Sequence, residues 1–427
     1  MKKRLVALIL VSTLLMLKII VVANINSSEK TPLIHFSDCV IGLVASNAGG
    51  SDVVLLNTNT WSPTMLIEFA DVTADNYVAI SCDGKYIAYT TWDKHFARRY
   101  LKILDMVTGY ETIYFDNIPA RSEIKDISWM PDSKTLLFTI NNTSEQAYQE
   151  IHSLNVEDGT ETIIDKGEVW KVKTVENVGE TADDFFLRGA HQYLSVKGKE
   201  IISHTGVNNS STEEWNYFLL QDDIDKIYNF YGGSGSFNID DIISYMYVEF
   251  SAPRCSSDGK SIIYSATLTR NSAYGEETPL WMASAIWKYD VLSGKKSIIY
   301  AQTDGGAIGR TDWVSDDSIA FVSYYDFQGS RDSINTFNID TLAHRVIFPY
   351  SEEHYNNVTL IPIGENSIVF TSSAKGKAFQ ASEVIKLEID SLNTAVLDVQ
   401  FNGTKLLLSG FSYVKLITHE AKEGQGN

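Results

Sequence analysis

The sequence is short of the residues that interrupt or crosslink a chain. It has 8 Pro and 3 Cys among 427 residues, with the cysteines at positions 39, 82 and 255. Scarce proline argues against long disordered linkers. Three widely separated cysteines form neither a disulfide framework nor the spacing of a zinc site. We therefore expect no disulfide-stapled scaffold, and we expect Cys82 and Cys255 to be small buried fillers.

Positive charge is also scarce. The chain has 35 Lys and Arg against 54 Asp and Glu, a formal net charge of −19, and no stretch gathers Lys and Arg into a stripe. An acidic chain repels the phosphate backbone, so we expect no nucleic acid as a partner. The same charge keeps a protein soluble and favours basic or cationic partners.

Long apolar runs are confined to the N-terminus. The basic residues MKKR precede an apolar stretch from Leu5 to Ala23 that only Lys18 interrupts. Two interpretations stay open: a signal peptide cleaved at Val21-x-Ala23, or an uncleaved anchor. Both leave the N-terminus in the cytoplasm and export the rest. We therefore expect an extracytoplasmic protein that is membrane-anchored or secreted, with residues 1–27 as signal peptide or signal anchor.

What the chain does contain is a repeated phrase and many aromatic residues. A polar turn followed by strand-type residues recurs as SCDGKYIAYTT, MPDSKTLLFTI and RCSSDGKSIIYSA, and aromatic content of 22 Tyr, 19 Phe and 8 Trp suits a large β-protein. Seven such phrases align at Gly84, Ser133, Gly198, Gly259, Asp316, Glu365 and Gly403. A period of about 40 to 65 residues with strands between the turns indicates propeller blades. No stretch after the leader shows the 3.6-residue period of an amphipathic helix.

Each repeat divides into four strands, named A to D. In the second repeat we expect them at 76–80, 86–91, 100–106 and 111–116, with tight turns at Asp83-Gly84 and Thr108-Gly109. Residues 40–69 hold only three strands, and 404–417 supply spare ones, so the C-terminus should complete the first blade and close the ring. The best count is seven four-stranded antiparallel blades in an all-β propeller, with six and eight left open. An N-terminal hydrophobic helix should precede the propeller. The repeat at Gly198 is the most degenerate, with 215–220 and 226–231 as its outer pair.

The phrases SSDGKSIIYSA, SCDGKYIAYTT and SWMPDSKTLLFT resemble the repeats of TolB-like β-propellers. They are similar also to the propeller domains of prolyl-oligopeptidase-type peptidases. The resemblance covers roughly residues 35–415 and implies a propeller domain at 34–418, followed by a polar tail at 419–427. The repeat motif of TolB-like propellers is structural, so the resemblance assigns no binding residue. No hydrolase domain follows the repeats, so we expect no peptidase activity.

Function is expected at the long connections. Blade topology places the B–C and D–A connections at one face, where long loops are usually kept for binding. Recognition candidates from these loops are Trp92, Asp93, His95, Tyr148, Tyr274, Trp281, Tyr325 and Phe327. The alternative is that these side chains pack beneath their own loops. The eight histidines lack metal-ligand spacing, so we expect neither a metal nor a cofactor.

These expectations combine into one hypothesis and one alternative. The hypothesis is a monomeric, exported, non-enzymatic propeller that binds a protein, peptide or glycan of the cell envelope through the long-loop face and central channel. The alternative is a glycan-active enzyme, a glycosidase or lyase, that uses carboxylates such as Asp93, Asp326 and Glu277 at the channel mouth.

Overall fold

The computed structural model describes twenty-two segments: residues 39–45, 51–67, 74–92, 99–114, 122–142, 148–167, 170–174, 185–187, 192–197, 200–205, 215–219, 246–270, 280–302, 306–324, 332–349, 354–355, 360–364, 366–374, 383–397, 399–401, 404–405 and 408–412. The predicted leader at 1–27 and the tail at 419–427 lie outside them, so the N-terminal helix stays a prediction. Among the residues that are described, no helix has the length and apolarity needed to span a membrane.

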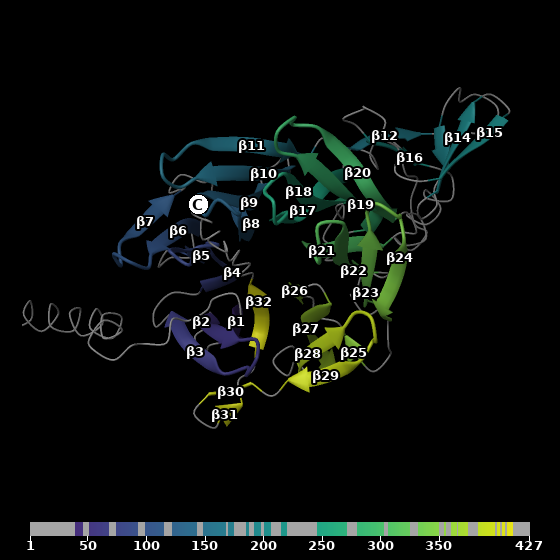
Figure 1. Ribbon diagram of the computed structural model, residues 1–427. Coiled ribbons are helices and arrows are strands. Elements are labelled where there is room, and N and C mark those ends of the chain that lie inside the picture. The colour runs from purple at the N-terminus through teal and green to yellow at the C-terminus, as the bar shows by residue number, and fades with distance from the viewer. Residues whose placement is uncertain are drawn as a thin grey trace, which may run out of the picture.

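Six antiparallel sheets stand around a common centre (Figure 1). Blade 1 has the order β3 (Pro63–Ile67), β2 (Ser51–Asn57), β1 (Cys39–Ala45) and β32 (Leu408–Ser412). Blade 2 contains β4 (Ala74–Ile80), β5 (Tyr86–Trp92), β6 (Arg99–Asp105) and β7 (Glu111–Tyr114). Blade 3 contains β8 (Ser122–Trp129), β9 (Thr135–Asn142), β10 (Tyr148–Asn155) and β11 (Glu161–Lys166).

The other half of the ring repeats this order. Blade 4 contains β17 (Met246–Cys255), β18 (Ser261–Arg270), β19 (Leu280–Asp290) and β20 (Lys296–Gln302). Blade 5 contains β21 (Ala307–Trp313), β22 (Ser318–Tyr324), β23 (Asp332–Asn338) and β24 (His344–Phe348). Blade 6 has five strands: β25 (His354–Tyr355) and β26 (Ile361–Ile363) both pair with β27 (Ser367–Ala374), which β28 (Glu383–Glu388) and β29 (Thr394–Leu397) follow.

Closure of the ring follows the prediction. The C-terminal strand β32 pairs antiparallel with β1, for example Gly42 opposite Phe411, and so becomes the inner strand of blade 1. The two ends of the repeat region therefore share one sheet, in which β1 is paired along both edges.

The predicted count of seven four-stranded blades is wrong. The described residues form five sheets of four strands and the five-stranded sheet of blade 6. At Gly198 the hairpin of β14 (Gln192–Lys197) and β15 (Glu200–Thr205) joins β13 (Phe185–Leu187) in a separate three-stranded sheet. At Gly403 the short strands β30 (Gln400–Phe401) and β31 (Thr404–Lys405) pair only with each other.

The outer pair expected for the Gly198 repeat is also different. β16 (Trp215–Leu219) pairs in parallel with β12 (Trp170–Thr174), and the expected partner 226–231 lies outside the described residues. The prediction placed the Gly198 repeat between blades 3 and 4. These two blades instead contact each other directly, since Ser128 Oγ of β8 donates to the Pro253 carbonyl of β17 at 2.6 Å. In Figure 1, β14 and β15 lie outside the ring. Residues 168–245 are therefore an insertion between two neighbouring blades.

The repeated phrase builds the turn between strands A and B. In blade 4, Ser256 Oγ donates to Asp258 Oδ1 at 2.7 Å, and the Lys260 N–H donates to the same carboxylate oxygen at 3.0 Å. Gly259 takes a φ of 76°, which only glycine adopts without steric cost. Ser81 and Asp83 form the same contact in blade 2 at 2.7 Å. The phrase recurs in blades 2 and 4 because its serine and aspartate make the same contacts in both turns.

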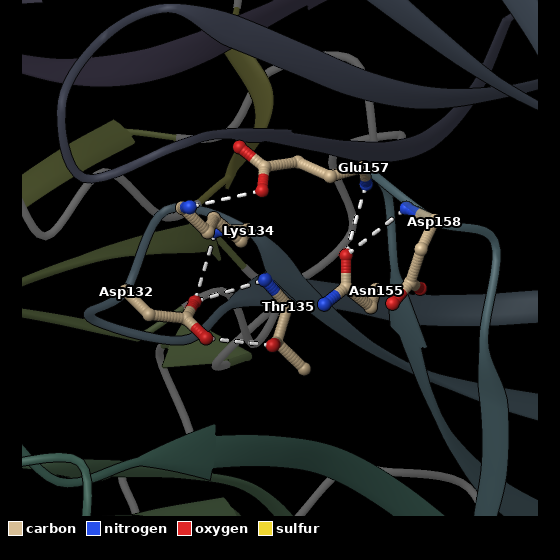
Figure 2. A network of polar contacts seen from close by, with 6 residues as sticks. All are labelled: Asp132, Lys134, Thr135, Asn155, Glu157 and Asp158. Carbon is tan, nitrogen blue, oxygen red and sulfur yellow. Dashed lines mark hydrogen bonds and ion pairs between the residues drawn. The ribbon is translucent and has the colours of Figure 1, made fainter.

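The turns between strands C and D are equally regular. In all six blades the N–H of the turn's first residue donates to the carbonyl that follows the turn, at distances of 2.8 to 3.2 Å. Figure 2 shows the A–B and C–D turns of blade 3 side by side, joined by Lys134 and Glu157 at 2.9 Å. The Val156 N–H also donates to the Lys134 carbonyl at 2.9 Å. We call this side of the ring the turn end, and the opposite side, where B–C and D–A connections begin, the loop end.

The core lies between the blades rather than inside one. One buried cluster joins blades 2 and 3 through Ala79, Leu101, Ile124 and Phe138, and others join blades 4 and 5, 5 and 6, and 6 and 1. The outermost strands of blades 5 and 6 begin with three exposed residues each, whereas most of β20 in blade 4 is buried. Burial therefore stabilises the ring as a whole, because the sheets bury their faces against neighbouring sheets.

Polar contacts fix the blades in register. The indole N–H of Trp129 donates to the Ala79 carbonyl of the preceding blade, and Trp313 does the same to Arg254, both at 3.1 Å. Between blades 3 and 4, buried Asp165 accepts from Tyr264 at 2.5 Å and from Lys296 at 2.9 Å. Burial raises the pKa of Tyr264 well above its ordinary value, and the Asp165 charge raises it further. Tyr264 therefore stays a neutral donor to Asp165.

Candidate functional site at the loop end of the inner strands

The structure places the backbone of three predicted recognition residues at the loop end. Trp92 ends β5 opposite Arg99, Tyr148 begins β10 opposite Asn142, and Trp281 pairs with Thr269. Trp281 belongs to a strand, because β18 extends to Arg270 and β19 begins at Leu280. Trp281 was predicted in a long connection, and the structure places it in β19.

The other predicted residues fall outside the described part of the chain. These are Asp93, His95, Tyr274, Tyr325 and Phe327, together with the carboxylates Glu277 and Asp326 of the enzyme alternative. Their role in recognition stays a prediction, as does that of Trp92, Tyr148 and Trp281.

A cluster that the sequence did not single out lies at the loop end of blade 5. Tyr324 ends β22 opposite Ala307, the first residue of β21. Burial raises the pKa of Tyr324 far above its ordinary value. The Asp332 carboxylate also raises it, the Arg310 guanidinium lowers it, and Asp126 of blade 3 raises it. Charges from two different blades thus act on one phenol, and Tyr324 is the residue directly before the predicted recognition residue Tyr325.

Gly309 in β21 and Gly306 directly before it make room for this tyrosine. A Cβ atom at Gly309 would lie 2.3 Å from Tyr324 Cε2, and one at Gly306 would lie 2.4 Å from the Tyr324 carbonyl oxygen. Such distances are far below van der Waals contact, so no other residue fits without movement. Glycine within a strand pattern marks this kind of close approach. The Gly309 carbonyl in turn accepts hydroxyl groups of Ser251 at 3.2 Å and Ser265 at 3.1 Å.

Irregular inner strands bring the charged groups into the cluster. The A strands of blades 2 to 5 all shift register, in blade 3 between Lys125 and Ser128 and in blade 5 between Ile308 and Thr311. Such bulges redirect side chains. Asp126 lies within the blade 3 bulge with a φ of 54°, and half-buried Arg310 lies within the blade 5 bulge.

A buried ion pair supports the same strands. Arg254 of β17 and Asp312 of β21 are 2% and 1% exposed, with Nε and Oδ2 3.7 Å apart. Arg254 also donates from Nη1 to the Pro253 carbonyl at 2.9 Å. Removing one partner of a buried pair leaves an uncompensated charge, which is strongly destabilising. The pair therefore holds blades 4 and 5 together beside the cluster.

The cluster contains hydrogen-bond donors, acceptors and both signs of charge. Among the described residues, no group of three or more His, Cys, Asp or Glu side chains is arranged to hold a metal ion.

A closed ring of radially arranged antiparallel sheets, with bulged inner strands around its axis, defines a β-propeller. No protein-family model and no curated protein matches the sequence. Solved structures do match. TolB from Acinetobacter baumannii is 15% identical with a TM-score of 0.48, and the match covers 88% of this chain and 65% of that chain.

Two further solved structures are similar. A TolB-type protein from Agrobacterium tumefaciens is 13% identical with a TM-score of 0.42, and the match covers 84% of this chain and 88% of that one. A prolyl endopeptidase is 10% identical with a TM-score of 0.41, and the match covers 86% of this chain and 52% of that one. The propeller architecture predicted from the turn phrases is confirmed by the sheets themselves.

Proposed function

We propose that this chain is an exported, membrane-tethered binding protein whose propeller recognises a protein, peptide or glycan of the cell envelope at the loop end. The observation that carries the proposal is the Tyr324 cluster. Tyr324 ends β22 opposite Ala307 and Asp332, Arg310 lies in the neighbouring bulge of β21, and the charge of Asp126 in blade 3 acts on the same phenol. Polar groups at the turn end bond with one another within and between turns.

The ligand would contact both the Tyr324 cluster and the aromatic residues of the connections at the loop end. Arg310 and Asp126 would pair with polar or charged ligand groups, and side chains such as Trp281 and Phe327 would supply apolar anchors. Net charge favours a ligand or partner with basic groups.

Affinity capture from the native envelope tests the proposal. The immobilised full chain should retain a component that the Arg310→Ala and Phe327→Ala variants lose. Tyr110→Ala is the matched control, because Tyr110 is 71% exposed at the turn end. Equal capture by wild type and the loop-end variants, or loss with Tyr110→Ala alone, would contradict binding at the loop end.

Export is tested separately by fusing a reporter active only outside the cytoplasm after residue 30. Activity of this reporter supports export, whereas activity of a cytoplasmic reporter at the same junction would exclude it.

A further inference from the structure

Exposed apolar side chains gather at one part of the ring. All large hydrophobic residues that the described segments leave exposed lie in the C–D hairpins: Val107, Tyr110, Ile113, Ile163, Val291, Leu292, Leu342, Val346, Leu392 and Val396. The most exposed are at the turn end, with Leu292 96% and Val107 78% exposed. The described A–B turns nearer the axis expose none. The turn end thus has a polar centre and an apolar rim.

Backbone strain marks two of these rim residues. The fifth residue of the C–D turn is Gly109, Gly159 and Gly294 in blades 2, 3 and 4, with φ of 68°, 74° and 69°. In blades 5 and 6 it is Leu342 and Leu392, with φ of 59° and 58°. A non-glycine residue in this conformation costs roughly 1–2 kcal/mol.

Burial of the two leucine side chains does not offset this backbone strain. Leu342 is 36% exposed and Leu392 42% exposed, and neither belongs to the buried clusters of blades 5 and 6. Trp61 holds the same position in blade 1 with a φ of 56°, but it packs against the cluster between blades 6 and 1. Stability alone favours glycine at 342 and 392. Exposed leucines retained under strain point to a contact that the isolated ring does not show.

The chain also enters the ring at the turn end. Cys39 begins β1 directly opposite Asn57, the first residue of the C–D turn of blade 1. The apolar segment predicted to anchor the chain ends at Ala23, so residues 24–38 can span at most about 50 Å. A chain anchored through residues 5–23 therefore enters the ring from the turn end, and the linker keeps that point of entry within about 50 Å of the bilayer.

We infer that the turn end of the propeller rests on the surface of the lipid bilayer, with the C–D turns of blades 2, 4, 5 and 6 entering the interfacial layer. This inference rests on the proposed membrane tether. Aliphatic and aromatic side chains on separate turn tips fit shallow interfacial insertion. The exposed carboxylates of Glu157, Asp340 and Asp390 between these tips favour a zwitterionic surface over an anionic one. The loop end then faces away from the membrane and stays open to its ligand.

Fluorescence quenching in phosphatidylcholine vesicles tests the contact. The full chain, with Cys39→Ser, carries one fluorophore through Asn393→Cys beside Leu392, or through Lys166→Cys. Both positions are exposed, but Lys166 ends β11 at the loop end. The native Cys82 and Cys255 are buried. We expect phosphatidylcholine bearing a nitroxide to quench the Asn393→Cys label several-fold more than the Lys166→Cys label.

A rim variant separates contact from folding. Leu342→Gly and Leu392→Gly remove apolar groups and relieve backbone strain. Combined with Leu292→Ser, they should leave the melting temperature unchanged or higher. In the same variant, quenching of the Asn393→Cys label should fall to the level of the Lys166→Cys label. Equal quenching at both labels in vesicle-bound wild-type chain would overturn the inference and leave the tether standing. Failure of the wild-type chain to float with the vesicles would overturn both the membrane tether and the contact of the turn end with the bilayer.

Discussion

At the scale of single residues, the glycines of this ring divide into two physical kinds. Those in the C–D turns, such as Gly109, have open space around the position of a Cβ atom and are required only for their positive φ. Those in β21, such as Gly309, are required because Tyr324 occupies that space. The two kinds should respond differently to the same substitution.

Gly109→Ala should destabilise the protein by about 1 kcal/mol, because alanine meets no neighbour there and bears only the cost of left-handed backbone. The midpoint of denaturant unfolding measures this. Tyr110→Ala, on the neighbouring exposed residue, is the control and should shift the free energy of unfolding by less than about 0.5 kcal/mol. Equal effects of the two substitutions would contradict the conformational explanation.

Gly309→Ala should cost more, on the order of 1–3 kcal/mol, because its methyl group displaces the Tyr324 ring. In a Tyr324→Ala background the same change should cost much less, since the ring is gone. A double-mutant cycle on the free energy of unfolding measures this coupling. Additive effects would show that the clash is relieved elsewhere.

At the scale of the elements, the turn chemistry was readable from the sequence and the inner-strand chemistry was not. The pairs Asp83-Gly84 and Thr108-Gly109 predicted two turns at the observed places, because each turn is built from neighbouring residues. The Tyr324 cluster joins β8, β21, β22 and β23 and depends on bulges, which the local pattern does not reveal. Gly306 and Gly309 within a strand pattern were the available signal.

Acid should weaken the A–B turns. The Lys260 side chain lowers the pKa of Asp258, as do the Lys260 N–H and the Ser256 hydroxyl, and Ser315, Asn338 and Ser318 do the same for Asp317. A depressed folded-state pKa contributes stability above the unfolded-state value near 4, and that stability is lost as the pH falls through the folded-state value.

The melting temperature of wild type should therefore exceed that of Asp258→Asn at pH 7, and the difference should shrink as the pH falls below about 4. Asparagine has the same shape as aspartate but cannot ionise at this position. The variant is therefore the reference against which the effect of the Asp258 charge is measured at each pH. A difference that stays constant with pH would show that the carboxylate charge contributes nothing to the turn.

At the scale of the whole molecule, the ring and its closure were predictable but the number of blades was not. Seven turn phrases suggested seven blades, yet the phrases at Gly198 and Gly403 form hairpins outside the A–B position. A hairpin is a local event, whereas a blade also needs faces that pack on both neighbours. In this ring, blade 3 already buries that surface against blade 4.

The insertion can therefore be removed. A Cβ atom at Gly167 would lie 3.6 Å from the Val248 carbonyl oxygen, and the Phe250 N–H donates to Gln149 Oε1 at 2.7 Å, so the chain leaves and re-enters the ring at one point. Replacing residues 168–245 with a short Gly-Ser linker should leave the melting temperature within a few degrees of wild type, since closing a shorter loop costs less entropy. As a control, deletion of β32 should abolish cooperative melting, because it reopens blade 1. If removing 168–245 unfolds the chain as completely as losing β32 does, the segment is part of the ring after all, and direct packing of blade 3 on blade 4 is insufficient to close it.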